Sequence, residues 1–194
     1  MRKPLAHTRK LVLPPEPVEI AAGWLQLTPW TGIPDAEIAE LISDPGFRRW
    51  HVRPPDLGNG AVQKWLSNRY ERWQTRELLS FAVRDANSGA LVGEVTLSDL
   101  TPWDGSAWIG YSTMPAARGH GVATHALGVL TRWGFEAVGL HRIQLGHAVE
   151  NTASCRVAIK ANYPVEGILR SSLPRPTGGW WDMEVHAAVN PADS

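Results

Sequence analysis

The spacing of hydrophobic positions changes several times along the chain, and each spacing predicts one type of element. Alternating apolar and polar residues predict a first strand at Gly23–Trp30. Apolar residues three and four apart predict a short helix that begins at Pro34 and a longer helix over Ala61–Arg76. Alternating segments separated by turns rich in Asp, Asn and Gly predict three successive strands, at Leu79–Arg84, Ala90–Leu97 and Ala107–Thr113.

After Pro115 the spacing becomes that of one long helix, with Gly139 placed to end it. Its apolar face consists of Val122, Ala126, Val129, Leu130, Trp133 and Ala137. The remaining elements are a strand, a helix and two closing strands, at His141–Val149, about Thr152–Ala161, Glu166–Arg170 and Trp181–Val189. We therefore predict one α/β (α+β) domain over residues 23–189, with a mixed, mostly antiparallel sheet flanked by helices, behind an extended N-terminal arm at residues 1–22.

Composition and charge exclude several classes of partner. Nineteen basic and nineteen acidic residues cancel, so we expect no nucleic acid and no anionic membrane surface as partner. No apolar run approaches the ~20 residues of a membrane span. The single cysteine, Cys155, cannot form an intramolecular disulfide, which predicts a cytoplasmic protein. The sequence leaves open whether the chain forms a homodimer.

The strongest candidate for chemistry is the short basic loop between the strand ending at Thr113 and the long helix. Gly119 and Gly121 allow backbone N–H groups to converge on an anion, and the first-turn amides of the helix add a partial positive charge. Arg118 is expected to supply a full positive charge beside it. The loop predicts a phosphate or pyrophosphate site.

Three phosphate-binding patterns compete for this loop. The ATP-type pattern is excluded because no Gly-Lys pair occurs in the chain. A dinucleotide fingerprint fits Gly119 and Gly121 but fails at Thr124, where its third glycine should stand, although Glu150 could reach a ribose. The third pattern, R-x-x-G-x-A, fits at Arg118, Gly121 and Ala123.

With that motif the chain resembles the GCN5-related N-acetyltransferase (GNAT) family, especially its RimJ/RimL type, which acetylates protein N-termini. The downstream stretches Asn151–Ser154, Lys160–Tyr163 and Glu166–Arg170 match the family pattern, and the resemblance spans roughly residues 23–189. It implies acetyl-CoA as co-substrate, with amides near Ser112 and Met114 binding the pantetheine arm. The implied cofactor-binding residues are Ser112, Thr113, Met114, Arg118, Gly119, His120, Gly121, Val122, Ala123, Thr124, Asn151 and Ser154.

The proton donor and the base are less well defined. The resemblance implies that Ser154 protonates the leaving thiolate, but Ser154 also stands at the N3 position of a helix capped by Asn151, where a local hydrogen bond would explain it. The glutamate that many relatives carry is replaced by Trp108. Glu94 is the best substitute as base or water-orienting group, although its alternation with Val95 and Leu97 is equally typical of a solvated face. Lesser candidates are Asp99, Glu150 and His147, which continues an apolar face and so favours a core position.

No metal-ligand spacing and no nucleophile motif occurs, and the seven histidines are scattered along the chain. We therefore expect no metal, and direct acetyl transfer in a ternary complex. The acceptor amine is open between a protein or peptide N-terminus and a small amine such as an antibiotic, polyamine or amino-acid derivative. A CoA-binding regulatory module without activity is a further alternative. Trp180 and Trp181, beside Gly178–Gly179, are candidates for a wall of the acceptor cleft or for core.

Overall fold

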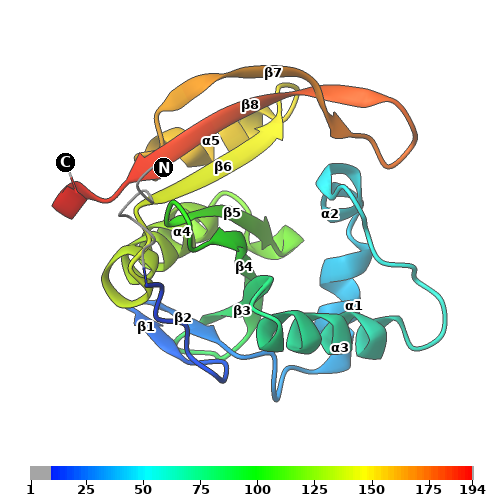
Figure 1. Cartoon of the computed structure of the whole chain (residues 1–194). Helices are drawn as coiled ribbons and strands as arrows, with labels where there is room; N and C mark the ends of the chain where they lie inside the picture. Colours follow the sequence, from blue (N-terminus) through cyan, green and yellow to red (C-terminus); the bar gives the residue numbers. More distant parts are fainter. Residues whose placement is uncertain (1–9, 194) are drawn as a thin grey trace.

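Eight strands form one sheet in the order β1-β2-β3-β4-β5-β6-β8-β7 (Figure 1). The computed structural model describes residues 10–193. Adjacent strands are antiparallel except β5 and β6, which are parallel, so the predicted mixed and mostly antiparallel sheet is confirmed. The strands are β1 (Ile20–Ala22), β2 (Leu25–Thr28), β3 (Leu78–Asp85), β4 (Leu91–Thr101), β5 (Ser106–Thr113), β6 (Arg142–Ala148), β7 (Val165–Pro174) and β8 (Trp180–Val189).

Within the described residues, five α-helices join the strands: α1 (Asp35–Ser43), α2 (Pro45–Trp50), α3 (Ala61–Gln74), α4 (Val122–Trp133) and α5 (Thr152–Lys160). Four of them lie where the sequence predicts helices. The exception is α2, a six-residue helix with a proline in its first turn, of which only Phe47 is buried. One buried side chain leaves no periodic pattern, so helical spacing could not reveal it.

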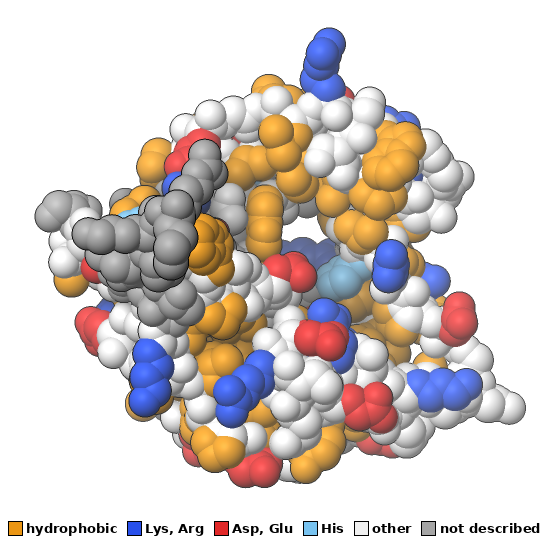
Figure 2. All heavy atoms as spheres, viewed as in Figure 1, with side chains coloured by type: hydrophobic (Ala, Val, Ile, Leu, Met, Phe, Trp, Pro, Cys, Tyr) orange, Lys and Arg blue, Asp and Glu red, His pale blue; other side chains and the backbone are white. Residues whose placement is uncertain are grey.

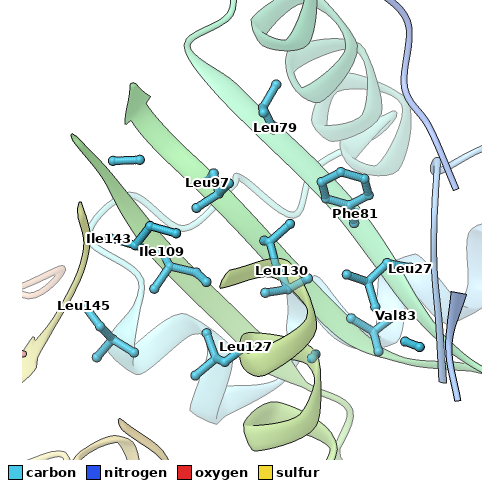
Figure 3. Close-up of a cluster of buried hydrophobic side chains, with 14 of the residues drawn as sticks. Leu27, Leu79, Phe81, Val83, Leu97, Ile109, Leu127, Leu130, Ile143 and Leu145 are labelled. Carbon is cyan, nitrogen blue, oxygen red and sulfur yellow. The ribbon is translucent and has the colours of Figure 1, made fainter. Parts of the chain in front are cut away.

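The main core lies between α4 and one face of the sheet (Figure 3). Leu127 and Leu130 of α4 are fully buried against strand residues such as Phe81, Leu97 and Ile109. Burying each of these large apolar side chains contributes about 1.5–3 kcal/mol. This packing holds the start of α4, and therefore the basic loop before it, at one end of β5.

The predicted apolar face of α4 is correct up to Trp133 and wrong at its end. Residues Gly134–Val138 form a π-helical turn, which adds a residue to the turn and rotates the side chains that follow. Val138 is therefore fully buried where the helical spacing predicts Ala137. Gly139 ends the segment with a φ of 85°, as predicted.

A second core covers the opposite face of the sheet. Ile38 and Leu41 of α1 and Trp65 of α3 pack with Ala82 of β3 and Leu91 of β4. The helices therefore flank both faces, and the face carrying α1–α3 is the one toward which Glu94 points, because its neighbours Val95 and Leu97 belong to the α4 core.

The segment predicted as an N-terminal arm, residues 1–22, ends in a strand of the sheet. Residues 1–9 lie outside the described part of the chain, and Ile20–Ala22 form β1, which pairs with β2. Between them the chain has no helix or strand, but Leu11, Leu13 and Val18 pack against the main core. The sheet therefore begins before residue 23, because these apolar side chains bring the arm onto the domain.

Candidate active site

The parallel strands β5 and β6 separate partway along their length. They pair with each other only where Ser106–Trp108 lies opposite Arg142–Gln144. Beyond that point both strands continue without pairing to one another, although β5 stays paired with β4 and β6 with β8. An unpaired strand edge offers backbone N–H and C=O groups to a ligand. The predicted binding of an extended arm along the end of β5 therefore has an open edge to use.

The amides that can reach such an arm differ in part from those predicted. The Met114 N–H already donates to the Val92 carbonyl of β4 at 3.0 Å. Because successive amides of a strand point in opposite directions, the donors on the β6 side are those of Tyr111 and Thr113, while Ser112 turns toward its β4 partner Glu94. The amides available to the pantetheine arm are therefore those of Tyr111 and Thr113, one residue before each of the predicted Ser112 and Met114.

The glycine loop opens onto a groove of about 510 Å³ beside the start of α4. Gly119 and Gly121 have φ values of 81° and 80°, in the left-handed region that favours glycine. No atom lies within 4 Å of where a Cβ on either residue would stand, so the space beside the loop is open. Gly121 is the N-cap of α4, which places the positive end of the helix at the groove. The groove is lined by Trp24, Gly119, Gly121, Thr124, His125, Gly128, Val129, Arg132, Lys160, Ala161 and Asn162.

The cations beside this groove are Arg132 and Lys160 rather than Arg118. The Arg118 guanidinium pairs with Asp44, the residue that caps α2 through the Phe47 N–H at 2.7 Å. The expectation that the Arg118 side chain supplies the charge at the anion is not supported by this placement. Arg132 ends α4 and Lys160 ends α5, so only the packing of these two helices brings their side chains to one groove.

Ser154 lies where β5 and β6 separate and is buried. Its backbone N–H donates to the Asn151 side chain at 3.2 Å, which confirms Asn151 as the N-cap of α5. Its hydroxyl oxygen accepts from the Tyr111 hydroxyl at 3.1 Å. Burial raises the pKa of Tyr111 and the bond to Ser154 opposes it, so Tyr111 keeps its proton. The cap therefore leaves the Ser154 hydroxyl free to pass a proton on.

Tyr111, through its bond to Ser154, is a candidate site residue that the sequence pattern did not reveal. Its position in β5 alternates with Gly110 and Ser112, on the same face as the core residues Ala107 and Ile109, so the pattern assigns it to the core. No signal in the strand distinguishes a buried tyrosine from one whose hydroxyl reaches a site.

Glu94 is buried and not on a solvated face. Its Oε1 accepts from the Ser80 hydroxyl at 2.9 Å and from Nε of Arg69 at 2.8 Å, and Arg69 Nη2 lies 2.8 Å from the same oxygen. Arg69 in turn lies 3.5 Å from the centroid of the Trp65 ring. Among the described residues no group donates a hydrogen bond to Oε2 of Glu94, so this oxygen can accept one from the substrate amine or from a water.

His51, at the end of α2, lies within the electrostatic reach of Glu94 and Arg69. Its ring stacks on Phe47 with centroids 3.6 Å apart, and its Nδ1 lies 3.1 Å from the Phe47 carbonyl, which it can reach only as a donor. Burial lowers the pKa of His51 below its ordinary 6.5; Glu94 raises it and Arg69 lowers it. At neutral pH the ring is uncharged with its lone pair on Nε2, as a proton acceptor requires.

Aromatic rings bound the space over this face of the sheet. Trp50 of α2 and Trp181 of β8 lie with ring centroids 5.4 Å apart, so the α2 side of the molecule contacts the β8 side. Figure 2 shows a hollow at the centre of this view of the molecule. Trp181 is buried while Trp180 is 57% exposed, so only one of the two predicted wall residues is enclosed. The Trp108 ring packs directly on Gly146 of β6, where an added Cβ would come within 3.0 Å of it, so this ring contacts β6.

The lesser candidates lie elsewhere. Asp99 has a φ of 50° at the irregular end of β4 and hydrogen-bonds Ser98, and Glu150 is exposed beside Arg175 at 3.6 Å. His147 is buried on the face that carries α5, as its apolar pattern predicts. None of the three faces the Glu94–His51 pair.

No helix in residues 10–193 combines the length and apolar character needed to cross a bilayer.

Comparison with known proteins identifies the family. The model of the acetyltransferase (GNAT) domain matches residues 25–163. The probable N-acetyltransferase YjcK of Bacillus subtilis is 33% identical over 132 residues, which are 68% of this chain and 72% of YjcK. Among solved structures, Mycobacterium smegmatis RimJ in complex with CoA-disulfide is 28% identical, with a TM-score of 0.72 and coverage of 90% of this chain and 86% of that one.

A further structure shares the fold at lower identity. The microcin C7 self-immunity acetyltransferase MccE, in complex with acetyl-CoA and AMP, is 19% identical with a TM-score of 0.75, covering 86% of this chain and 93% of that one. The domain match over most of the chain, the relative at 33% identity, the separated strands and the glycine loop agree. The chain is a member of the GNAT family of acetyltransferases and uses acetyl-CoA to acylate an amine.

Proposed function

We propose that this protein transfers an acetyl group from acetyl-CoA to the α-amine of a protein or peptide N-terminus, directly and within a ternary complex. The observation that carries the proposal is the gap between β5 and β6, which joins an anion groove on one side to the Glu94–His51 pair on the other. The 28% identity to RimJ supports a protein N-terminus as acceptor.

In the proposed complex each part of acetyl-CoA has a place. The diphosphate lies on the amides around Gly119 and Gly121, and Arg132 and Lys160 line the same groove toward the other end of α4. The pantetheine arm pairs with the open edge of β5, where the amides of Tyr111 and Thr113 are available. The thioester then reaches the level of Ser154.

The proton steps follow from this placement. The neutral His51 ring, or Oε2 of Glu94 through a water, accepts a proton from the amine, whose nitrogen attacks the thioester carbonyl carbon. When the C–S bond breaks, the Ser154 hydroxyl gives its proton to the thiolate and regains one from Tyr111, which takes a proton from water in the same relay and so stays protonated. An α-amine has an unperturbed pKa of about 8, so its deprotonation costs less than that of a lysine.

A small amine is the second candidate acceptor. The contact between Trp50 and Trp181 joins the two sides of the acceptor face, which favours a compact, partly apolar substrate. CoA-thiol release, measured with short peptides of varied N-terminal residue and with a panel of polyamines, aminoglycosides and amino-acid derivatives, distinguishes the two acceptors. Turnover on small amines alone would contradict the first choice, and CoA binding without turnover on any amine would favour a regulatory module.

Removing the cations of the groove is expected to weaken acetyl-CoA binding without changing kcat at saturation. Each of Arg132→Ala and Lys160→Ala should raise the Kd for CoA about three- to tenfold, because each removes one exposed positive charge from the groove that takes the anionic part of CoA. Calorimetric titration at low and high salt measures the effect. Arg156→Ala removes an exposed cation of α5 that does not line the groove and should leave the Kd unchanged; an equal loss in this control would contradict the assignment.

The pH dependence of kcat is expected to identify the base. Because burial lowers the pKa of His51, wild-type activity should persist below pH 6.5 and fall only as the pH drops through that lowered value and the ring gains a proton. His51→Gln should abolish this acidic limb. Glu94→Gln should move it to lower pH, since Glu94 raises the His51 pKa.

The opposite pattern would assign the base to Glu94: a limb lost in Glu94→Gln and kept in His51→Gln. Both profiles are measured at saturating amine and acetyl-CoA, so that binding does not contribute. His141→Gln, at the far end of β6 beside Asp193, is the matched control and should keep the wild-type profile.

A further inference from the structure

Four potential metal ligands that are far apart in the sequence meet on the α5 side of the sheet. They are His147 of β6, Cys155 of α5, and Glu184 and His186 of β8, and their ligand atoms all lie within 4.8 Å of one another. The register explains the meeting, because His147 lies opposite Glu184 and His186 follows two residues later on the same face. The histidines that are scattered in the sequence therefore include a pair in direct contact.

The two imidazoles have the tautomer that a metal site requires. The Nδ1 atom of His147 lies 2.8 Å from the Ala148 carbonyl, and that of His186 lies 2.9 Å from the Tyr163 carbonyl. A carbonyl only accepts, so each Nδ1 carries a proton, and in the neutral ring the lone pair is on Nε2. Anchoring of the second ring nitrogen by a backbone carbonyl is the usual support of a metal-bound histidine.

The lone pairs converge and need a cation between them. The two Nε2 atoms are 3.0 Å apart. Glu184 Oε1 lies 3.0 Å from His186 Nε2 and 3.4 Å from His147 Nε2. The Cys155 sulfur lies within 4.8 Å of the same carboxylate and of both Nε2 atoms. Both histidines are buried, at 4% and 0% exposure, so water cannot separate these groups.

We propose that these four side chains bind one Zn²⁺ ion as a closed structural site. Imidazole nitrogen, thiolate sulfur and carboxylate oxygen are all zinc ligands, and four is the number that tetrahedral structural zinc takes, with ligand atoms about 3.4 Å apart at its bond lengths. The thiolate and carboxylate also cancel the charge of the ion, which suits a buried position. The sequence expectation of no metal rests on spacing along the chain, and these ligands come from three separate elements.

The ion would tie α5 to β6 and β8. Cys155 follows Ser154 directly, and Asn151 caps the same helix, so the site fixes the helix that carries the proposed proton donor. With four protein ligands it has no open position for a substrate. The ion would therefore position α5 and stabilise the fold, and this role is the same whichever amine the enzyme acetylates.

Metal binding is tested on the full-length protein, stripped with a chelator and titrated with Zn²⁺ and with Co²⁺. Cys155 is the only thiol of the chain, so every thiol signal reports this site. We expect one equivalent of Zn²⁺ by native mass spectrometry, a thiolate-to-cobalt charge-transfer band with Co²⁺, and at least a tenfold slower reaction of Cys155 with a thiol reagent when Zn²⁺ is bound.

Variants locate the ion. Cys155→Ala and Glu184→Gln change partly exposed side chains and should each weaken Zn²⁺ binding at least tenfold, while His141→Gln, outside the cluster, should not. A thiol that reacts equally fast with and without Zn²⁺, or a cobalt complex without the thiolate band, would overturn the proposal and leave a shared proton as the cation between the histidines. Zinc binding that is unaffected by both cluster variants would overturn it as well. None of these measurements requires acetyltransferase activity.

Discussion

Ser154→Ala is expected to lower kcat by about 10²- to 10⁴-fold, the range that a positioned proton donor contributes. The Kd for acetyl-CoA should change little, because the α5 cap uses the backbone N–H of residue 154 and not its hydroxyl. The variant therefore removes the proton donor and keeps the helix. Steady-state kinetics and a CoA titration measure the two quantities separately.

Tyr111→Phe tests the source of the proton. It keeps the ring in place and removes the hydroxyl that donates to Ser154, so kcat should fall, but by less than in Ser154→Ala, since water can replace the lost proton. Ser43→Ala, an exposed position of α1, is the control for handling and folding. A kcat for Ser154→Ala within twofold of wild type would remove Ser154 from the mechanism and leave it a purely local role.

Arg69→Met is expected to cost about 3–5 kcal/mol of the free energy of unfolding, as observed when one partner of a buried ion pair is removed. Methionine retains most of the apolar stem, but it removes the guanidinium that lies over the Trp65 ring and leaves the Glu94 carboxylate, whose side chain is 2% exposed, without its cation. Equilibrium unfolding in urea, followed by tryptophan fluorescence and circular dichroism, measures the loss.

Arg72→Met, three residues later on α3, is the matched control. Its ion pair with Glu77 spans 3.5 Å between side chains that are 37% and 63% exposed, and such surface pairs contribute at most about 1 kcal/mol. The double variant Arg69→Met/Glu94→Gln should recover part of the loss, because it removes the unpaired buried charge. If Arg69→Met and Arg72→Met lower the free energy of unfolding equally, the buried Arg69–Glu94 pair contributes no more than a surface pair, which contradicts the prediction.

Several parts of the fold follow from local patterns in the chain. The long helix, its glycine end at Gly139 and the N-cap at Asn151 depend on residues within a few positions of one another, so spacing and capping rules predict them. The same holds for the glycine loop, because the left-handed backbone at Gly119 and Gly121 requires glycine wherever the loop lies. These features also carry the family resemblance.

Features set by side chains from distant segments could not be predicted in this way. Glu94 alternates with apolar residues as a solvated glutamate would, and only the position of α3 over β4 makes it buried and paired with Arg69. Arg118 looks like the cation of the loop, but α2, which no pattern predicts, brings Asp44 to it. His51 enters the site through the same short helix.

The amino-acid sequence was sufficient to predict the strand, the glycine loop and the helix that we propose as the acetyl-CoA site, because backbone geometry and helix ends are local properties. The pairing of Tyr111 with Ser154, the burial of Glu94 and the meeting of two histidines with Cys155 and Glu184 required the folded chain. Each joins side chains from different elements across the sheet, and burial and charge pairing depend on which elements pack together rather than on their order in the sequence.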